Sequence, residues 1–191
     1  MGCRKEWCDI LQYMKTKFKT FYWSKNTEVI FQPFTELPKD IPVTSCMGMA
    51  VLDKEQLVLS SPDRGWGLPG GHSEEGETPV ETLVRELEEE AAVEIDLDTL
   101  QVVGGWLIKK LHKTEKNSKY PDLAYQLLFI ADIKKVNEFK ERFEVHQRIF
   151  VPIKDVINYA GGPNFIPIFN YVVDTYPERF TKQTEEKRKK V

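Results

Sequence analysis

Residues 63–93 constrain the fold of this chain more than any other stretch, because a glycine-rich loop leads there into a well-marked helix. The loop reads Asp-Arg-Gly-Trp-Gly-Leu-Pro-Gly-Gly and ends at Gly71, and four glycines with one proline are typical of a shaped loop. Thr78 is a good N-cap, Pro79 suits the first helical position, and Glu81 completes a capping box. These residues predict a helix that begins at Pro79, close behind the loop.

The predicted helix has two faces of different chemistry. An apolar stripe is expected to pack on the core; it consists of Val80, Leu83, Val84, Leu87 and Ala91. Glu86, Glu89 and Glu90 stand at positions i, i+3 and i+4, where like charges repel by roughly 0.2 to 0.5 kcal/mol per pair. A run of glutamates is more often a solvated helix face. Beside a glycine loop, however, three carboxylates suit Mg²⁺, which takes oxygen ligands together with substrate phosphates.

The order of residues 71–93 closely resembles the Nudix box, G-x5-E-x7-R-E-U-x-E-E-x-G-U, where U is an aliphatic residue. The matching positions are Gly71, Glu77, Arg85, Glu86, Leu87, Glu89, Glu90 and Val93. Ala92 replaces the second glycine at the helix end, where a left-handed alanine costs roughly 1 to 2 kcal/mol. The alternative is a helix that runs on past this position. Either way, the replacement removes no metal-binding side chain.

The resemblance to the Nudix hydrolase superfamily implies an α/β fold, an α/β/α sandwich around a mixed sheet, with a catalytic loop-helix-loop segment. It also implies Mg²⁺ or Mn²⁺ ions that bridge a diphosphate. By position, Glu89 and Glu90 would be the principal ligands and Glu86 a further ligand or a water-activating group. Gly71 would add its backbone carbonyl oxygen to this set.

Arg85 and Glu77 would then orient these carboxylates through hydrogen-bonded pairing. A plain surface pair between Arg85 and Glu89 is the simpler alternative. The expected chemistry is in-line attack of water at phosphorus, because bound metal neutralises the diphosphate and lowers the pKa of a bound water. The expected catalytic set is therefore Arg85, Glu86, Glu89 and Glu90.

The general base and the substrate contacts are less constrained by the sequence. In this family the base is often the counterpart of Glu86 or a glutamate beyond the box, here Glu141 or Glu144. His146 is a further candidate, although ordinary exposed charge is the simpler interpretation of all three downstream residues. Trp66 and Glu144 are the candidates for substrate contact, Trp66 by stacking on a base; filling the core is the alternative for Trp66.

The substrate is expected to be a small nucleotide with a diphosphate linkage. Subgroups that cleave ADP-ribose or diadenosine polyphosphates carry a proline or tyrosine beyond the box, and neither stands at 108–111. Elimination favours a nucleoside triphosphate such as an oxidised dNTP; an ADP-ribose or nucleotide-sugar pyrophosphatase is the alternative. Two other classes remain, a non-catalytic Nudix-like nucleotide-binding regulator and an isopentenyl diphosphate isomerase. A regulator usually has an eroded box, and Cys46 lacks the sequence context of an isomerase cysteine.

The rest of the chain predicts an N-terminal extension at 1–44, a Nudix domain at 45–180 and a polar basic tail at 181–191. Within the extension we expect a helix at about 7–21 and a strand at 28–34. Such an extension could pack on the domain, line the cleft or make a homodimer contact. Strands are expected at 47–52, 56–59, 124–131 and 148–153, with a basic loop at 109–119.

Composition and charge argue against several classes of protein. The 191 residues are 41% hydrophobic and 30% charged, the balance of a soluble globular domain, and the net charge of −3 gives no pull toward nucleic acid. No apolar run has the roughly 20 residues of a membrane span, so we expect a cytoplasmic protein without a membrane partner. Three cysteines without metal-binding spacing are expected to be free thiols, with Cys46 a buried core residue.

Overall fold

The computed structural model describes residues 18–62, 65–112, 120–141, 145–160 and 162–181. The strands are β1 Phe21–Ser24, β2 Thr27–Pro33, β3 Val43–Leu52, β4 Gln56–Pro62, β5 Gly70–His72, β6 Val93–Ile95, β7 Gln101–Lys110, β8 Leu123–Val136 and β9 Val145–Pro152. The helices are α2 Pro79–Ala91, α3 Val156–Tyr159 and α4 Ile166–Thr175, with short 3₁₀ turns η1 Leu97–Thr99, η3 Ile153–Asp155 and η4 Pro177–Arg179.

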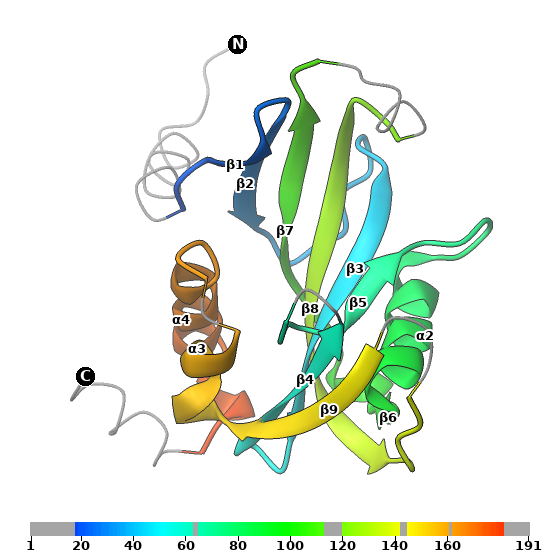
Figure 1. Cartoon of the computed structure of the whole chain (residues 1–191), viewed down its shortest axis with the longest axis vertical. Helices are drawn as coiled ribbons and strands as arrows, with labels where there is room; N and C mark the ends of the chain where they lie inside the picture. The colour runs from blue at the N-terminus through cyan, green and yellow to red at the C-terminus, as the bar shows by residue number, and fades with distance from the viewer. Residues whose placement is uncertain (1–17, 63–64, 113–119, 142–144, 161, 182–191) are drawn as a thin grey trace.

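The strands form one mixed sheet in the order β1-β2-β7-β8-β3-β4-β9, with β5 paired to β3 and β6 to β8. β3 and β8 run parallel to each other, and neighbouring pairs such as β7–β8 and β4–β9 are antiparallel. Helix α2 lies on one side of this sheet, while α3 and α4 lie on the other (Figure 1). The mixed sheet between helices confirms the predicted α/β/α architecture.

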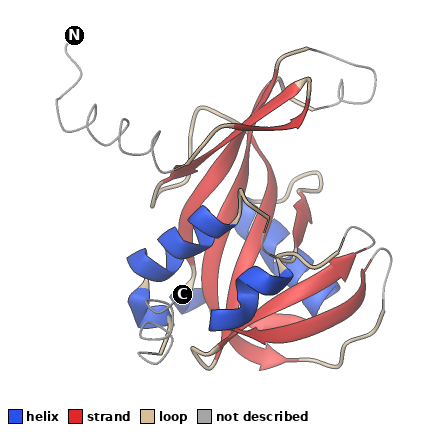
Figure 2. Cartoon of the chain, turned by 60° about the vertical axis from the view of Figure 1, so that its left-hand side comes forward, coloured by secondary structure: helices blue, strands red, loops and turns tan. Residues whose placement is uncertain are grey.

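Each face of the sheet has its own hydrophobic core. Helix α4 contributes Ile168, Phe169, Val172 and Val173 to the cluster that includes Phe31, Trp106 and Leu128. Helix α2 contributes Leu83, Leu87 and Ala91 to the cluster that includes Cys46, Leu127 and Phe129. Because consecutive strand residues point to opposite faces, β8 places Leu127 in one core and Leu128 in the other. The central strands are therefore covered on both faces (Figure 2).

The N-terminal part of the chain extends this sheet. The predicted strand at 28–34 is confirmed as β2, which pairs antiparallel with β7. The predicted helix at 7–21 is wrong at its end, because Phe21 lies in strand β1; residues 7–17 lie outside the described part of the chain. The spacing of apolar residues that suggested a helix there did not show that Phe21 joins the sheet edge.

Other expectations have mixed outcomes. The hairpin of β3 and β4 and the strands β8 and β9 are confirmed. Val84 is exposed and does not belong to the apolar stripe of α2. Lys109 and Lys110 belong to β7 rather than to a loop, because pairing with β2 continues to that point; residues 113–119 of the predicted basic loop lie outside the described residues. None of the helices in the described ranges combines the length and the hydrophobicity that a membrane span needs.

Candidate active site

The candidate site lies where β4 and β5 separate from each other. Strand β3 pairs with β5 through residues 45–47 and with β4 only through residues 51–52, so the sheet opens between β4 and β5. Glu90 of α2 reaches this opening. Its Oε2 accepts hydrogen bonds from the backbone N–H of Gly70, at 2.9 Å, and from the Ser60 hydroxyl, at 3.1 Å. One glutamate thus ties helix α2 to both strands.

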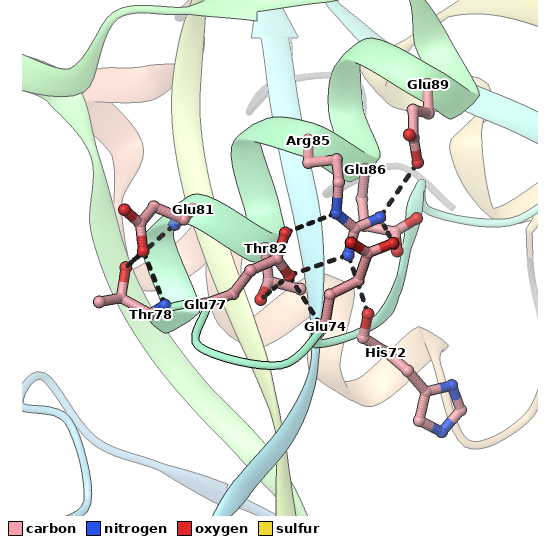
Figure 3. Close-up of polar contacts among 9 residues, drawn as sticks. All are labelled: His72, Glu74, Glu77, Thr78, Glu81, Thr82, Arg85, Glu86 and Glu89. Atoms are coloured by element: carbon pink, nitrogen blue, oxygen red, sulfur yellow. Dashed lines mark hydrogen bonds and ion pairs between the residues drawn. The ribbon is translucent and has the colours of Figure 1, made fainter.

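The start of α2 is fixed as the sequence predicts. Thr78 is the N-cap, and its hydroxyl oxygen accepts a hydrogen bond from the Glu81 backbone N–H at 3.3 Å. The Glu81 carboxylate in turn accepts one from the Thr78 backbone N–H at 2.8 Å, which completes the capping box (Figure 3). Pro79 occupies the first helical turn. These contacts satisfy donors that a helix start otherwise leaves without partners, and they anchor α2 behind the loop.

Arg85 is the centre of the polar network (Figure 3). Its guanidinium binds the carboxylate of Glu77 in a bidentate manner, at 2.7 and 3.0 Å. It also donates to Glu86 at 2.9 Å, to Glu89 at 3.0 Å and to the backbone carbonyl of His72 at 2.9 Å. The hydrogen bond from Arg85 is the main reason that the pKa of Glu77 is lowered to about 2. The Arg85 guanidinium therefore contacts three carboxylates of the Nudix box, those of Glu77, Glu86 and Glu89. The simpler alternative was a single surface pair between Arg85 and Glu89.

Gly71 and Glu86 form a close contact that needs glycine. A Cβ atom at Gly71 would lie 2.4 Å from Oε1 of Glu86 and 2.7 Å from its Cδ. The Glu86 side chain belongs to a residue that is only 8% exposed, and burial raises the pKa of its carboxyl, against the opposing effect of Arg85. The loop backbone thus approaches a desolvated carboxylate directly, as the expected carbonyl and carboxylate ligand pair requires.

The residues present fit a hard divalent cation. Glu86, Glu89, Glu90 and the Gly71 carbonyl offer only oxygen donors, which Mg²⁺ and Mn²⁺ prefer. Within the described residues, no three Asp, Glu, His or Cys side chains already converge as a ligand set. The hydrogen bonds explain this, because Arg85 holds Glu89 while Gly70 and Ser60 hold Glu90. A cation would therefore have to draw these carboxylates together, and each has a second oxygen with which it could bind while Oε2 keeps its present partner.

A cleft of about 930 Å³ runs from this carboxylate cluster across the face of the sheet. Its volume suits a ligand of nucleotide size, since ligand pockets commonly measure roughly 300 to 1,000 Å³. The described residues that line it are Phe21, Tyr22, Trp23, Ser45, Met47, Gly70, Gly71, His72, Glu86, Glu90, Trp106, Gln126, Ala160, Gly162, Asn164 and Phe165. The cleft therefore has an acidic end at α2 and β5 and an aromatic and amide-bearing remainder.

Strand register explains how the floor of the cleft is built. Trp106 on β7 stands opposite Gln126 on β8, Gln126 opposite Ser45 on β3, and Ser45 opposite His72 on β5. Directly paired residues point to the same face of a sheet. The indole of Trp106, the amide of Gln126 and the hydroxyl of Ser45 therefore lie in one row on the same face of the sheet. The row ends on β5, the strand that contains Gly71.

The structure separates the remaining sequence candidates. Trp66 is partly buried and packs against the core cluster of α4, and the described lining of the cleft does not include it. Glu141 pairs with His146 at 2.5 Å, and neither belongs to that lining. Glu144 lies outside the described residues. Of the base candidates that the structure describes, Glu86 is the one that lines the cleft.

Sequence reasoning missed most of the aromatic and amide lining, which includes Tyr22, Trp23, Trp106, Gln126 and Phe165. They come from four parts of the chain, β1, β7, β8 and the segment before α4, which only the fold brings together. One signal was available, since Gln126 is a polar residue inside the otherwise apolar stretch 123–131 of β8.

Cys46 is inaccessible from the cleft. It is fully buried in the core beneath α2, and burial, aided by the charges of Glu86 and Glu77, raises the pKa of its thiol to about 12. A thiol at that pKa stays protonated at neutral pH and is not nucleophilic. Cys46 therefore does not fit the reactive cysteine that the isomerase alternative requires, and its burial confirms the expected core cysteine.

Comparison with known proteins finds relatives in sequence and in fold. An RNA pyrophosphohydrolase of Cereibacter sphaeroides is 34% identical over 61 residues, which are 29% of this chain and 38% of that protein, so the match spans less than half of the relative's length. A pyrophosphohydrolase of Bacillus subtilis has a similar fold, with a TM-score of 0.60 and 18% identity over 82% of this chain and 96% of that one.

An Ap4A hydrolase of C. elegans is also similar in fold, with a TM-score of 0.52 and 14% identity over 71% of this chain and 98% of that one. At such identities the likeness concerns the fold alone. The family model described as NUDIX domain matches residues 43–169, well over half of the chain. This match, which contains the whole box from Gly71 to Val93, shows that the chain belongs to the NUDIX family.

Proposed function

We propose that this chain is a divalent-metal-dependent hydrolase that cleaves the diphosphate linkage of a nucleoside diphosphate derivative. The observation that carries the proposal is the meeting of Glu86, Glu90 and Gly71 at one end of a cleft large enough for a nucleotide. A solvated helix face would not place two of its glutamates in a cleft. Membership of the NUDIX family and likeness to pyrophosphohydrolases support the same reaction class.

Glu89, Glu90 and the carbonyl of Gly71 would hold Mg²⁺ or Mn²⁺. When bound, the metal neutralises the diphosphate and lowers the pKa of the water that attacks phosphorus. Arg85 aims the carboxylates, because its guanidinium already binds Glu86 and Glu89 and is itself fixed by Glu77. Such support is commonly worth about 10- to 100-fold in metal affinity or activity.

Glu86 is the residue that we assign as proton acceptor for the attacking water. It lines the cleft, whereas Glu141 is engaged with His146 away from the described lining. A carboxylate in this position is within the region where a diphosphate beside Gly71 would bind. The assignment rests on this position, as a general base must reach the proton that it removes.

A nucleoside triphosphate, such as an oxidised dNTP, is the first candidate substrate. RNA is a second candidate, because one relative is an RNA pyrophosphohydrolase and a structurally similar protein is a pyrophosphohydrolase. ADP-ribose and nucleotide sugars complete the panel of candidate substrates to be tested. A non-catalytic regulator would bind some of these compounds without cleaving them.

The test is hydrolysis of this panel by the full chain, with Mg²⁺ and after chelation. The proposal expects turnover of at least one diphosphate compound that stops on chelation and that falls by at least about 100-fold in a Glu89→Gln, Glu90→Gln double variant. Glu88→Gln is the matched control, because Glu88 is an exposed glutamate of the same helix. Abundant turnover by the double variant, or turnover that survives chelation, would contradict the assignment of the ligands.

A further inference from the structure

Two polar side chains on the floor of the cleft lack a partner within the protein. Ser45 of β3 is only 4% exposed, Gln126 of β8 is partly buried, and both line the cleft. Among the residues that the structure describes, neither side chain has a hydrogen-bond partner. Polar groups that leave water are nearly always hydrogen-bonded, because desolvation without a new partner costs free energy. Both side chains are therefore placed for a partner that enters the cleft.

Strand pairing puts these two side chains in line with the acidic end of the cleft. Ser45 stands opposite Gln126 on β8 and opposite His72 on β5, the strand that contains Gly71. Directly paired residues share one face of the sheet. Neighbouring strands lie about 4.8 Å apart, so Ser45 lies about 5 Å and Gln126 about 10 Å from β5 along this row. Both are therefore within reach of a nucleoside diphosphate whose phosphates lie beside Gly71.

The surroundings of Gln126 suit a flat group with a polar edge. Trp106 stands opposite Gln126 on β7, and Met47 lines the cleft from β3 on the other side. Both apolar side chains are held by the core cluster of α4. The carboxylates of the described lining, those of Glu86 and Glu90, come from α2. Gln126 thus offers an uncharged donor and acceptor between apolar side chains, and an amide can pair with a base edge through both.

The order of groups along this row matches the order of groups in a nucleotide. A nucleotide has phosphate, then sugar, then base. The row has the metal-binding loop at Gly71, then the hydroxyl of Ser45 one strand away, then the amide of Gln126 two strands away. With the phosphates fixed at Gly71, the sugar therefore lies over Ser45 and the base reaches Gln126.

We propose that Gln126 determines base selectivity by hydrogen-bonding the edge of the nucleobase, while the sugar of the same ligand lies over Ser45. This proposal rests on the proposed function and adds the residue that distinguishes one base from another. A site built to hydrogen-bond its ligand rejects an analogue that lacks the matching group, because its own polar groups are then left unpaired. Selectivity is therefore expected to depend on the amide of Gln126 and not on its volume.

The experiment measures binding by calorimetry in Mg²⁺ to the α,β-methylene diphosphates of adenosine, guanosine, cytidine and uridine, with methylenediphosphonate as the ligand without a nucleoside. Gln126→Leu should weaken the best-bound nucleotide by about 5- to 150-fold, since the base edge then lacks its partner, and leave methylenediphosphonate unchanged. Ser45→Ala should weaken all the nucleotides by about 2- to 10-fold and keep their order. Gln147→Leu is the matched control, because Gln147 is an exposed strand glutamine outside the described lining.

A second variant separates hydrogen bonding from side-chain volume. Gln126→Glu keeps the shape of the side chain but replaces the amide donor by a second acceptor. The added negative charge repels every diphosphate, so the informative quantity is the affinity of each base relative to uracil. Adenine, guanine and cytosine carry amino donors and uracil carries none, so these three ratios should rise. A glutamine with a merely structural role would leave them unchanged.

Each other outcome overturns the role of Gln126. Equal loss for nucleotides and methylenediphosphonate in Gln126→Leu would indicate a general structural effect, and unchanged binding of the nucleotides would show that Gln126 makes no contact. A changed order of bases in Ser45→Ala, with no change in the Gln126 variants, would place the base over Ser45 instead. The two proposals fail separately. Base-selective loss of binding without any turnover by the unmodified chain would refute the hydrolase only, whereas turnover with the same base preference in Gln126→Glu would refute the role of Gln126 only.

Discussion

Replacing Gly71 by alanine should damage activity far more than stability. The new Cβ would lie 2.4 Å from Oε1 of Glu86, so that carboxylate must retreat by about 1 Å to reach ordinary contact distance. Only the far end of a side chain is displaced, while the backbone of β5 keeps its pairing with β3. The retreat also disturbs the 2.9 Å hydrogen bond between Glu86 and Arg85.

The two effects have different expected magnitudes. Misplacement of a catalytic group by about 1 Å commonly costs on the order of 100-fold in rate, or about 2.7 kcal/mol. For stability, the lower chain entropy of alanine in the unfolded state offsets part of the weakened hydrogen bond, so the change should stay within about 1 kcal/mol. In a chain of this size that corresponds to about 2 to 4 °C in Tm.

The assay is kcat/KM on the best substrate together with Tm by calorimetry. Gly67→Ala is the matched control, because a Cβ at Gly67 meets nothing within 4 Å, and it should leave both quantities near their original values. A Gly71→Ala variant with unchanged kcat/KM would refute the reasoning, since Glu86 would then not need its position beside the loop. A collapse in Tm would show instead that the substitution breaks the fold.

Two further predictions concern the helix and its ion pairs. Ala92 is the C-cap of α2 and has φ +50°, where a β-branched residue is strongly disfavoured. In urea unfolding, Ala92→Val should therefore destabilise the protein by more than about 2 kcal/mol, whereas Ala92→Gly should change the stability by less than about 1 kcal/mol. Equal effects of the two substitutions would contradict the left-handed turn. The pKa of Glu77 is lowered to about 2, so its pairing with Arg85 should stabilise the fold fully above about pH 4.5 and be lost as pH falls through 2. An NMR titration of the Glu77 carboxyl should show this low pKa, and Arg85→Met should return it toward 4.5; a normal value in the unmodified chain would refute the bidentate pair.

The sequence predicted those parts of the structure that depend on local chemistry. The N-cap at Thr78 and the capping box with Glu81 need only residues three positions apart, and both formed as expected. Two outcomes were open at the helix end, a left-handed turn or a longer helix, and the structure has the left-handed turn at Ala92 in spite of its steric penalty. Arg148 of β9 helps to explain this, since its guanidinium donates to the carbonyl of Ala91 at 2.8 Å and thereby satisfies the helix end.

The parts that depend on distant pairing could not be predicted in this way. Phe21 was assigned to a helix, because apolar spacing near the N-terminus does not reveal that residues 21–24 join β2 with a bulge at Trp23. The row from Trp106 through Gln126 to Ser45 exists only because β7, β8 and β3 are adjacent in the sheet. Most of the strand residues that line the cleft are brought there by this long-range register.

The most direct test of the account is where a divalent cation binds. In an NMR titration with Mn²⁺, paramagnetic broadening should first remove the backbone amide signals of Gly71 and of the half of α2 that contains Glu86, Glu89 and Glu90. The Glu89→Gln, Glu90→Gln variant should need far more Mn²⁺ for the same loss, and Glu88→Gln should behave like the unmodified chain. Broadening that begins elsewhere, or that is unchanged in the double variant, would contradict the claim that this helix face holds the metal.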